Sequence, residues 1–200
     1  MTDTSTLLSN IRWYAQKNFT PIIDEHSWNY LEEIILKQKP KHVLEIWSAI
    51  GRSTLSIANI INEWGGDLIS CEISFPSYKM ACHYQSLSKV CNYSIYFADY
   101  CKLSSNYFAR PLDFVFIDGQ KNEYLKYFLT LTSQTITVRD QEKQTYILTP
   151  LLAATHTLVF DDIIKFAAKV QPLIEYLGEK KRAYEIVQTT GDDGFLVIYK

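Results

Sequence analysis

Acidic side chains follow five apolar runs that the sequence predicts to be strands. They are Glu45, Glu72, Asp99, Asp118 and the pair Asp161–Asp162. In an open parallel sheet the carboxyl ends of the strands face one crevice, so we expect these acids to converge there. Any one of them could instead cap the helix that follows it. Because gathered like charges are unfavourable without a cation, the repetition over five strands favours a shared binding site.

The last acids in the chain have the chemistry of a metal site. Asp118, Asp161 and Asp162 offer hard oxygen ligands, which suit Mg²⁺ better than a soft metal. Lys121 follows Asp118 by three residues, at the predicted start of a helix. It could act as a base toward a hydroxyl group at the metal, or it could be a simple counter-ion for the acids. The sequence leaves these two roles evenly balanced.

A second kind of site is predicted in residues 42–58, HVLEIWSAIGRSTLSIA. The apolar run 42–46 is too short for a typical helix, and a turn containing Gly51 separates it from an apolar-periodic segment that starts at Ser53. A strand, a tight loop and a helix in this order form a cradle for a nucleotide-type cofactor. Glu72 is placed to accept hydrogen bonds from a ribose diol, and Asp99 to lie near an adenine.

The pattern of elements predicts an α/β fold. Apolar runs at 42–46, 67–73, 93–97, 113–117 and 156–160 alternate with helical periodicity near 5–18, 53–58, 77–90, 121–131 and 165–178. Continuous apolar strands are typical of a parallel sheet that helices cover on both faces. Residues 184–188 and 195–199 flank a Gly191–Gly194 turn and predict a closing hairpin. We therefore expect a Rossmann-like, mostly parallel sheet of seven strands with a C-terminal antiparallel hairpin.

Residues 1–200 are expected to form a single domain, with N-terminal helices in 1–40. The polar stretch 132–147 is the exception to the regular alternation and is predicted to be an insertion. Residues 135–138 and 145–148 could pair as a hairpin, or the first of them could prolong the preceding helix. An unstructured loop of this length would be unusual in a compact domain.

Composition excludes several classes of protein. A formal net charge of −2 gives no overall reason to bind nucleic acid or an anionic membrane. The basic stretches 37–41 and 180–182 are more typical of solvated faces than of RNA contacts. The four cysteines lack the spacing of a zinc site, and neither a secretion signal nor a membrane span is present, so we expect a cytoplasmic protein.

These motifs together resemble the metal-dependent class I S-adenosylmethionine O-methyltransferases, the catechol and caffeoyl-CoA type. The resemblance runs from about residue 21 to the C-terminus and is carried by VLEIWSAIGRST, DFVFIDGQKNEY, LVFDDI and the closing GDDGFLVIYK. It implies a metal at Asp118, Asp161 and Asp162 and a base at Lys121. It also implies cofactor contacts at Glu45, Trp47, Gly51, Ser53, Glu72, Asp99, Tyr100 and Asp118.

The resemblance implies transfer of a methyl group from S-adenosylmethionine to a hydroxyl oxygen that Mg²⁺ or another divalent cation chelates. The acceptor would be a small molecule or a wobble nucleoside of tRNA. Residues 21–23, Pro-Ile-Ile, and the K-x-x-Y of 121–124 look most similar to the bacterial tRNA 5-hydroxyuridine branch. A homodimer is also implied, as in the family.

Trp47 departs from the family, which has glycine where the backbone must approach the cofactor. Trp28 also occupies a frequent glycine position, and the chain has only 7 glycines. One hypothesis is that these tryptophans come from UGA codons that specify glycine in the source cell. The alternative function is a catalytically silent binding protein whose cofactor loop Trp47 obstructs. A nicotinamide-binding Rossmann enzyme fits poorly because GxGxxG is absent.

Overall fold

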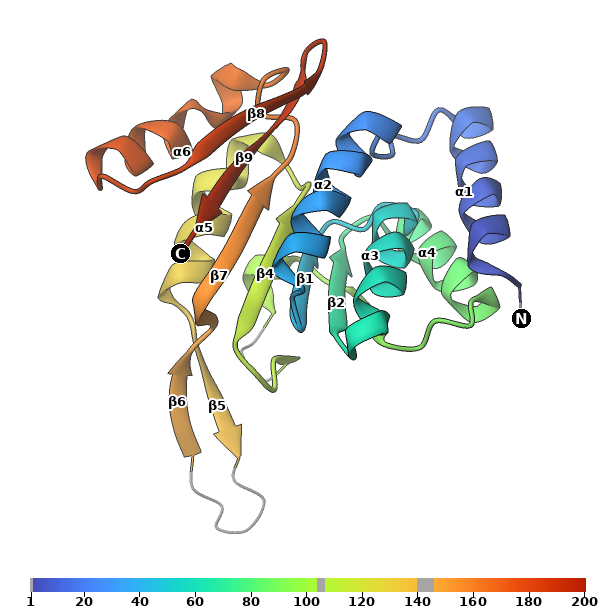
Figure 1. The fold of residues 1–200 in the computed structure, drawn as a ribbon, viewed down its shortest axis with the longest axis horizontal. Coiled ribbons are helices and arrows are strands. Elements are labelled where there is room, and N and C mark those ends of the chain that lie inside the picture. Colours follow the sequence, from blue (N-terminus) through green and yellow to red (C-terminus); the bar gives the residue numbers. More distant parts are fainter. Residues whose placement is uncertain (1, 104–106, 140–145) are drawn as a thin grey trace.

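A computed structural model of the chain describes residues 2–103, 107–139 and 146–200. Seven strands form one sheet in the order β3-β2-β1-β4-β7-β9-β8 (Figure 1). Neighbours among the first five are parallel, whereas β9 runs antiparallel to both β7 and β8. The predicted fold class is therefore confirmed. The strands are β1 (His42–Ile46), β2 (Asp67–Glu72), β3 (Tyr93–Phe97), β4 (Leu112–Ile117), β7 (Leu152–Phe160), β8 (Glu185–Thr190) and β9 (Asp193–Tyr199).

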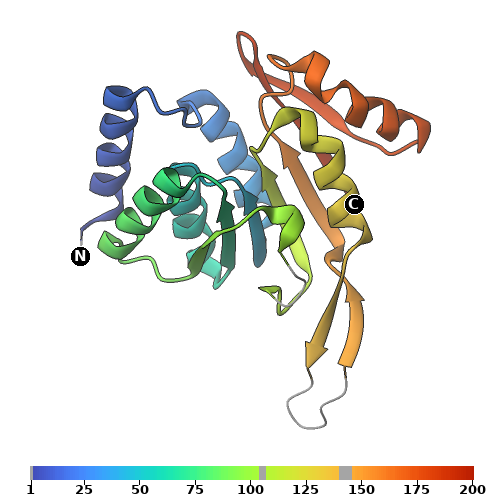
Figure 2. The same cartoon turned by 180° about the vertical axis from the view of Figure 1, so that it is seen from behind.

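Helices cover both faces of this sheet (Figures 1 and 2). The side chains of α1 to α4 join one apolar cluster, and those of α5 and α6 join another on the opposite face. Short 3₁₀ helices lie in the connections of the described chain. The helices are α1 (Thr4–Asn18), α2 (Glu25–Gln38), α3 (Arg52–Ile61), α4 (Phe75–Leu87), α5 (Tyr124–Ser133) and α6 (Ala167–Glu179), with η1 (Asn62–Trp64), η2 (Tyr100–Lys102) and η4 (Lys121–Glu123).

Strand β4 shows why the sheet needs both layers. Phe114 and Phe116 point into the α1 to α4 cluster, and Val115 and Ile117 point into the α5 and α6 cluster. Each of the four is fully buried. Successive side chains of a strand alternate between faces, so an uninterrupted apolar run is stable only when both faces are covered. This burial fixes the strand whose end carries Asp118.

The apolar side chains of the N-terminal helix pack against other helices of the same chain. Leu7, Ile11 and Ala15 are buried, and α1 packs on α3 and α4. These apolar side chains are therefore covered within the chain. Within the described ranges, no helix combines the length and the apolar character that crossing a bilayer requires.

The stretch 132–147 contains a hairpin. β5 (Thr135–Arg139) pairs antiparallel with β6 (Tyr146–Pro150), so the hairpin alternative is confirmed and the prolonged helix is wrong. The predicted strand residue Thr145 lies outside the described residues. The Leu151 N–H donates to the Gln134 carbonyl over 2.9 Å, which continues the ladder past the hairpin. β7 consequently begins at Leu152, four residues before the predicted start at His156, and the hairpin projects from the sheet (Figure 1).

Asp113 fixes the start of β1 beside β4 and yields a stability prediction. Its two carboxylate oxygens accept hydrogen bonds from the backbone N–H groups of Lys41, at 2.8 Å, and His42, at 2.9 Å. Asp113→Ala leaves both donors unpaired, so we expect it to lower the free energy of unfolding by about 1–3 kcal/mol. Urea denaturation measures this change. Asp113→Asn keeps one acceptor and should lose less; equal stability of all three proteins would contradict the assignment.

Candidate active site

Three of the predicted acids meet at the carboxyl edge of the sheet. The Asp118 N–H donates to the Ile46 carbonyl at 3.1 Å, and the Asp161 N–H donates to the Ile117 carbonyl at 3.0 Å. These bonds align the residues that follow β1, β4 and β7. Each of Asp118, Asp161 and Asp162 can contribute one carboxylate oxygen to a set that lies within 4.8 Å of one another. The convergence expected from the strand ends is present for this cluster.

Lys121 partly neutralises the negative charge of this cluster. Its Nζ lies 2.6 Å from Asp118 Oδ1 and 3.2 Å from Asp162 Oδ2. Burial by itself would lower the pKa of Lys121, but the carboxylates, Asp118 foremost, raise it well above its usual range. The ammonium group is therefore firmly protonated here and acts as a counter-ion. A role as base requires another cation to take over the carboxylates.

The acids themselves favour a bound cation. Burial raises the pKa of Asp161 well above its ordinary value, and the neighbouring Asp118 raises it further. Burial also raises the pKa of Asp118. A hard divalent cation would reverse both shifts, because it stabilises the ionised carboxylates. The donor set, three carboxylates on adjacent loops, fits Mg²⁺ in number and type of ligand.

The loop after β1 has an unusual backbone. Trp47, Ala49 and Gly51 have φ angles of 76°, 47° and 89°. A Cβ at Gly51 would meet the Cβ of Ala81 at 3.2 Å, so both conformation and space favour glycine there. Trp47 adopts a conformation that disfavours any side chain with a Cβ. The structure thus places strain at the position where the family resemblance expects glycine.

Trp28 does not share this feature. It lies inside α2, is 9% exposed, and its ring stacks with the Arg52 guanidinium at 5.6 Å. A helical position packed in this way suits a large side chain. Backbone geometry therefore supports a native glycine at position 47 and gives no such support at position 28.

Glu72 holds the same loop in place. Its Oε2 accepts the Ala49 N–H at 2.8 Å, and its Oε1 accepts the Ser74 N–H at 2.6 Å. The side chain is 2% exposed, and burial raises its pKa. A ribose diol would have to compete with the Ala49 N–H for this carboxylate. Glu72 therefore lies at the end of β2, as the sequence predicts, and both of its carboxylate oxygens already accept hydrogen bonds.

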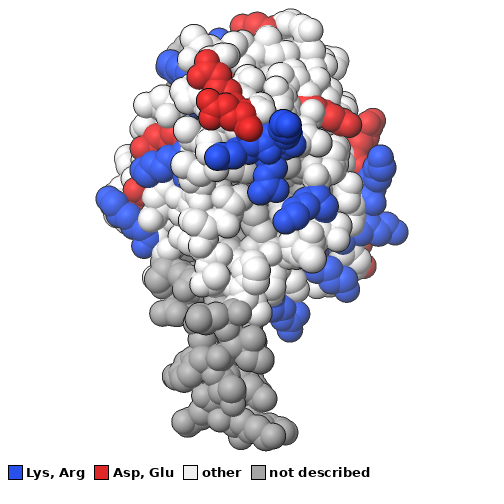
Figure 3. Space-filling view, turned by 90° about the vertical axis from the view of Figure 1, so that its left-hand side faces the viewer, with Lys and Arg blue, Asp and Glu red and all other residues white. Residues whose placement is uncertain are grey.

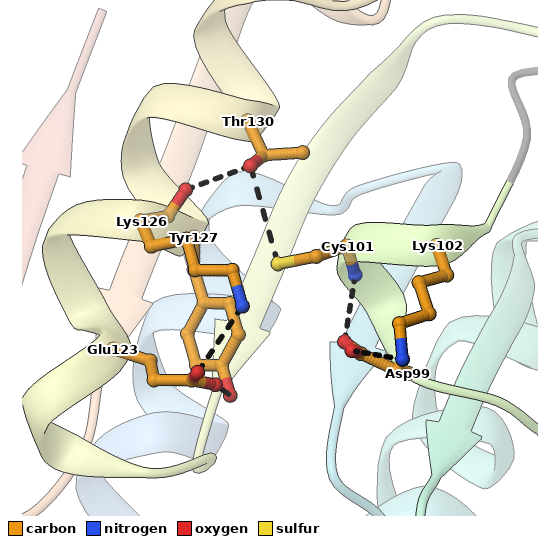
Figure 4. A network of polar contacts seen from close by, with 7 residues as sticks. All are labelled: Asp99, Cys101, Lys102, Glu123, Lys126, Tyr127 and Thr130. Carbon is orange, nitrogen blue, oxygen red and sulfur yellow. Dashed lines mark hydrogen bonds and ion pairs between the residues drawn. The ribbon is translucent and has the colours of Figure 1, made fainter.

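Asp99 starts the short helix η2, as Figure 4 shows. Its carboxylate accepts the Cys101 N–H at 3.0 Å and pairs with Lys102 at 3.7 Å. The Thr130 hydroxyl of α5 lies 4.0 Å from the Cys101 sulfur and links η2 to α5. These contacts fix the position of Tyr100, which is 1% exposed.

Glu45 is enclosed beneath the loop. Its Oε2 accepts hydrogen bonds from the hydroxyls of Thr54, at 2.5 Å, and Ser70, at 2.6 Å. Burial raises the pKa of Glu45 to about 7, although these hydroxyls and that of Ser53 favour the ionised form. Glu45 thereby joins β1, β2 and the first turn of α3, where Ser53 is itself buried.

Three buried polar atoms around the loop after β1 have no hydrogen-bond partner among the described residues. They are Glu45 Oε1, Ser48 Oγ and the Tyr100 hydroxyl. A buried polar group without a partner costs about 1–3 kcal/mol. The loop after β1 and the ends of β1 and β3 therefore present unused hydrogen-bonding groups, which fits a polar cofactor.

Sequence reasoning missed residues that only the fold brings to the rim. Asp193, at the start of β9, lies beside Asp162 and Asp24, and burial together with these two acids raises its pKa to about 7. The sequence predicts only a turn for the Gly191–Gly194 segment. Ser70 could have been noticed as a hydroxyl within an apolar strand, a pattern that indicates a buried hydrogen bond.

Comparison with known families agrees with this geometry. A family model described as O-methyltransferase matches residues 2–135. The chain belongs to the O-methyltransferase family. The matched region contains β1, the loop after β1 and Asp118, and it ends before Asp161 and Asp162.

Solved methyltransferases share the fold of this family member. TomG of Streptomyces achromogenes, an O-methyltransferase in complex with SAM, is 16% identical, with a TM-score of 0.78 and coverage of 100% of this chain and 91% of its own. An O-methyltransferase from Bacillus cereus in complex with SAH is 17% identical, with a TM-score of 0.73 and coverage of 100% and 92%. The SAH-bound Podospora anserina methyltransferase PaMTH1 is 14% identical, with a TM-score of 0.76 and coverage of 100% and 89%.

The backbone of this methyltransferase at Trp47 can be tested with two variants. Trp47→Ala and Trp47→Gly both remove the indole ring, but only alanine keeps the Cβ that disfavours a φ of 76°. We expect the glycine variant to be more stable than the alanine variant by about 1 kcal/mol, the reverse of the usual order. Chemical denaturation compares them. A more stable alanine variant would show that the loop is not left-handed at this position.

The buried Glu45 predicts a pH effect on stability. Its pKa rises from 4.5 to about 7 on folding, so its protonated form stabilises the fold below about pH 4.5, and this contribution is lost as pH rises through 7. Glu45→Gln cannot ionise. Relative to this variant, the wild type should lose about 3 kcal/mol between pH 4.5 and 8. Urea denaturation across this range measures the difference, and parallel curves would refute the shifted pKa.

Proposed function

We propose that this chain is an S-adenosylmethionine-dependent O-methyltransferase that acts on a hydroxyl group held by a divalent cation. The observation that carries the proposal is the cluster of Asp118, Asp161 and Asp162, whose oxygens lie within 4.8 Å at the same sheet edge as the loop after β1. Family membership supports methyl transfer to oxygen.

The cofactor would occupy the crevice beside the loop after β1. Ser48 Oγ and the Tyr100 hydroxyl, which lack partners among the described residues, are the groups we assign to hydrogen bonding with it. Glu72 is assigned to the ribose, for which it must release the Ala49 N–H. The three solved proteins named above are complexes with SAM or SAH, which supports this choice of cofactor.

Asp118, Asp161 and Asp162 are proposed to hold Mg²⁺ or another divalent cation. Such a cation would lower the pKa of an acceptor hydroxyl and orient its oxygen toward the methyl donor. Lys121, released from the carboxylates, would have a lower pKa than in the present ion pairs and could accept the hydroxyl proton. The same side chain thus serves as counter-ion without the metal and as base beside it.

Two acceptor classes remain in the proposal, a small-molecule hydroxyl and a modified wobble nucleoside of tRNA. The tRNA class rests on the resemblance of residues 21–23 and 121–124 to the tRNA-modifying branch. The experiment below distinguishes the two classes directly.

A second candidate is a binding protein of the same fold without catalytic activity. Two observations favour it: Trp47 carries its side chain at a left-handed position of the cofactor loop, and both oxygens of Glu72 are already bonded. Titration with S-adenosylhomocysteine separates the candidates. Binding to the protein with Trp47 supports the enzyme. Binding only to the Trp47→Gly variant supports obstruction of the cofactor loop by the indole ring, and no binding to either protein contradicts the proposed cofactor.

Mass spectrometry of the protein from its source cell tests the codon hypothesis. Glycine in the peptide that contains position 47 would explain its φ angle and remove the obstruction. Tryptophan there would refute the hypothesis at that position and leave the binding protein as the stronger alternative.

Methyl transfer from labelled cofactor provides the direct test of function. We expect label in catechol or in total tRNA, with loss of activity when EDTA removes the metal. Asp161→Asn should reduce the rate by about a hundredfold or more, because it removes one charged ligand from a buried site. Asp192→Asn, in the exposed β8–β9 turn, is the matched control and should leave the rate within about twofold. Activity that resists EDTA would exclude the metal from the proposal.

A further inference from the structure

A cavity lies at the opposite end of the sheet from the acids. It has a volume of about 670 Å³ and is enclosed by the C-terminal part of α5, the base of the β5–β6 hairpin, the first half of β7 and the end of β9. Phe128, Leu131, Leu152 and Ile198 give it an apolar floor. His156, its lining residue nearest to the acids along β7, precedes Asp161 by five residues, or about 16 Å of strand.

The rim of this cavity is positively charged. Lys181 and Arg182 of the α6–β8 connection and Lys200 after β9 line it, and all three are exposed. In the part of the chain that the structure describes, none of them forms an ion pair with a carboxylate side chain. Figure 3 shows Lys and Arg side chains bordering an uncharged area above the hairpin.

Two polar groups in the wall have unused hydrogen-bonding capacity. The Gln134 amide oxygen and the Thr149 hydroxyl are buried, line the cavity and have no hydrogen-bond partner among the described residues. Both lie at the base of the hairpin, where residue 135 pairs with residue 150 and residue 136 with residue 149. Buried groups of this kind are normally satisfied, so their shared location indicates a missing polar partner.

The imidazole of His156 lines the wall of the cavity. Burial lowers the pKa of His156, and Lys200 and Arg182 lower it further. The His156 Nδ1 lies 2.7 Å from the Ala153 carbonyl, which fixes the ring in the wall. A ligand that suits this environment must carry negative charge at the rim and an apolar body on the floor.

We propose that this cavity binds a small organic anion, an apolar ring or short chain that bears a carboxylate or phosphate. Lys181 and Arg182 bind the anionic group, the floor around Phe128 and Leu152 covers the apolar body, and Thr149 donates a hydrogen bond. The site is separate from the methyl-transfer edge, so the inference does not depend on the proposed function. The sequence alone had assigned residues 180–182 to a solvated face, and among them Lys180 does not line the cavity.

The experiment uses three probes of equal size and different charge on the full chain. Isothermal titration with 2-naphthoate, neutral 2-naphthamide and cationic 2-naphthylmethylammonium should show the tightest binding for 2-naphthoate. Lys181→Ala combined with Arg182→Ala should weaken 2-naphthoate binding by about tenfold or more, because two charge-assisted contacts are lost. Lys180→Ala is the matched control and should change the affinity by less than about twofold.

A second variant distinguishes loss of the binding site from loss of folding. Ala154 is exposed and lines the cavity, so Ala154→Trp should fill the space, abolish 2-naphthoate binding and leave the melting temperature unchanged. Equal affinity for the three probes, an equal loss in Lys180→Ala, or no binding at all would overturn the proposal. A dimer of the wild type that Ala154→Trp dissociates would also overturn it, because the cavity would then be an interface between copies.

Discussion

The charge balance among Asp118, Asp161, Asp162 and Lys121 is the constraint on which the acidic edge of the sheet depends. Three carboxylates whose oxygens come within 4.8 Å would repel one another in a buried setting, and Lys121 offsets this from 2.6 and 3.2 Å. The arrangement persists only because β1, β4 and β7 are held in register by cores on both faces. The apolar interior of the sheet thus positions the polar edge.

Two buried acids, Glu45 and Glu72, anchor the loop after β1 beside this edge through different contacts. Glu45 ties β1 and β2 to the first turn of α3 through two hydroxyls, and Glu72 binds the loop itself at the Ala49 N–H. The loop can therefore keep left-handed residues at 47, 49 and 51, because its ends are anchored on both sides. A cofactor would exchange some of these internal bonds for its own.

The two ends of the sheet have opposite electrostatic character. Acids gather at the carboxyl edge, whereas Lys181, Arg182 and Lys200 surround the cavity near the base of the hairpin. The hairpin and the α6–β8 connection create that cavity, and both follow α5 in the chain. A parallel sheet presents different loops at its two edges, so one domain can carry two separate sites.

The sequence by itself determined the α/β fold, the position of the acids at the strand ends and the loop after β1 with Gly51. Those features depend on local periodicity and on residue type at the end of a strand, which the chain order records directly. The tertiary structure decided that Lys121 is an ion-pair partner, that Glu72 is already bonded and that Asp193 joins Asp162. It also decided that residues 135–139 pair with residues 146–150 beside a basic cavity. Each of these depends on distances between segments far apart in the chain, and such distances are set by packing and not by sequence spacing.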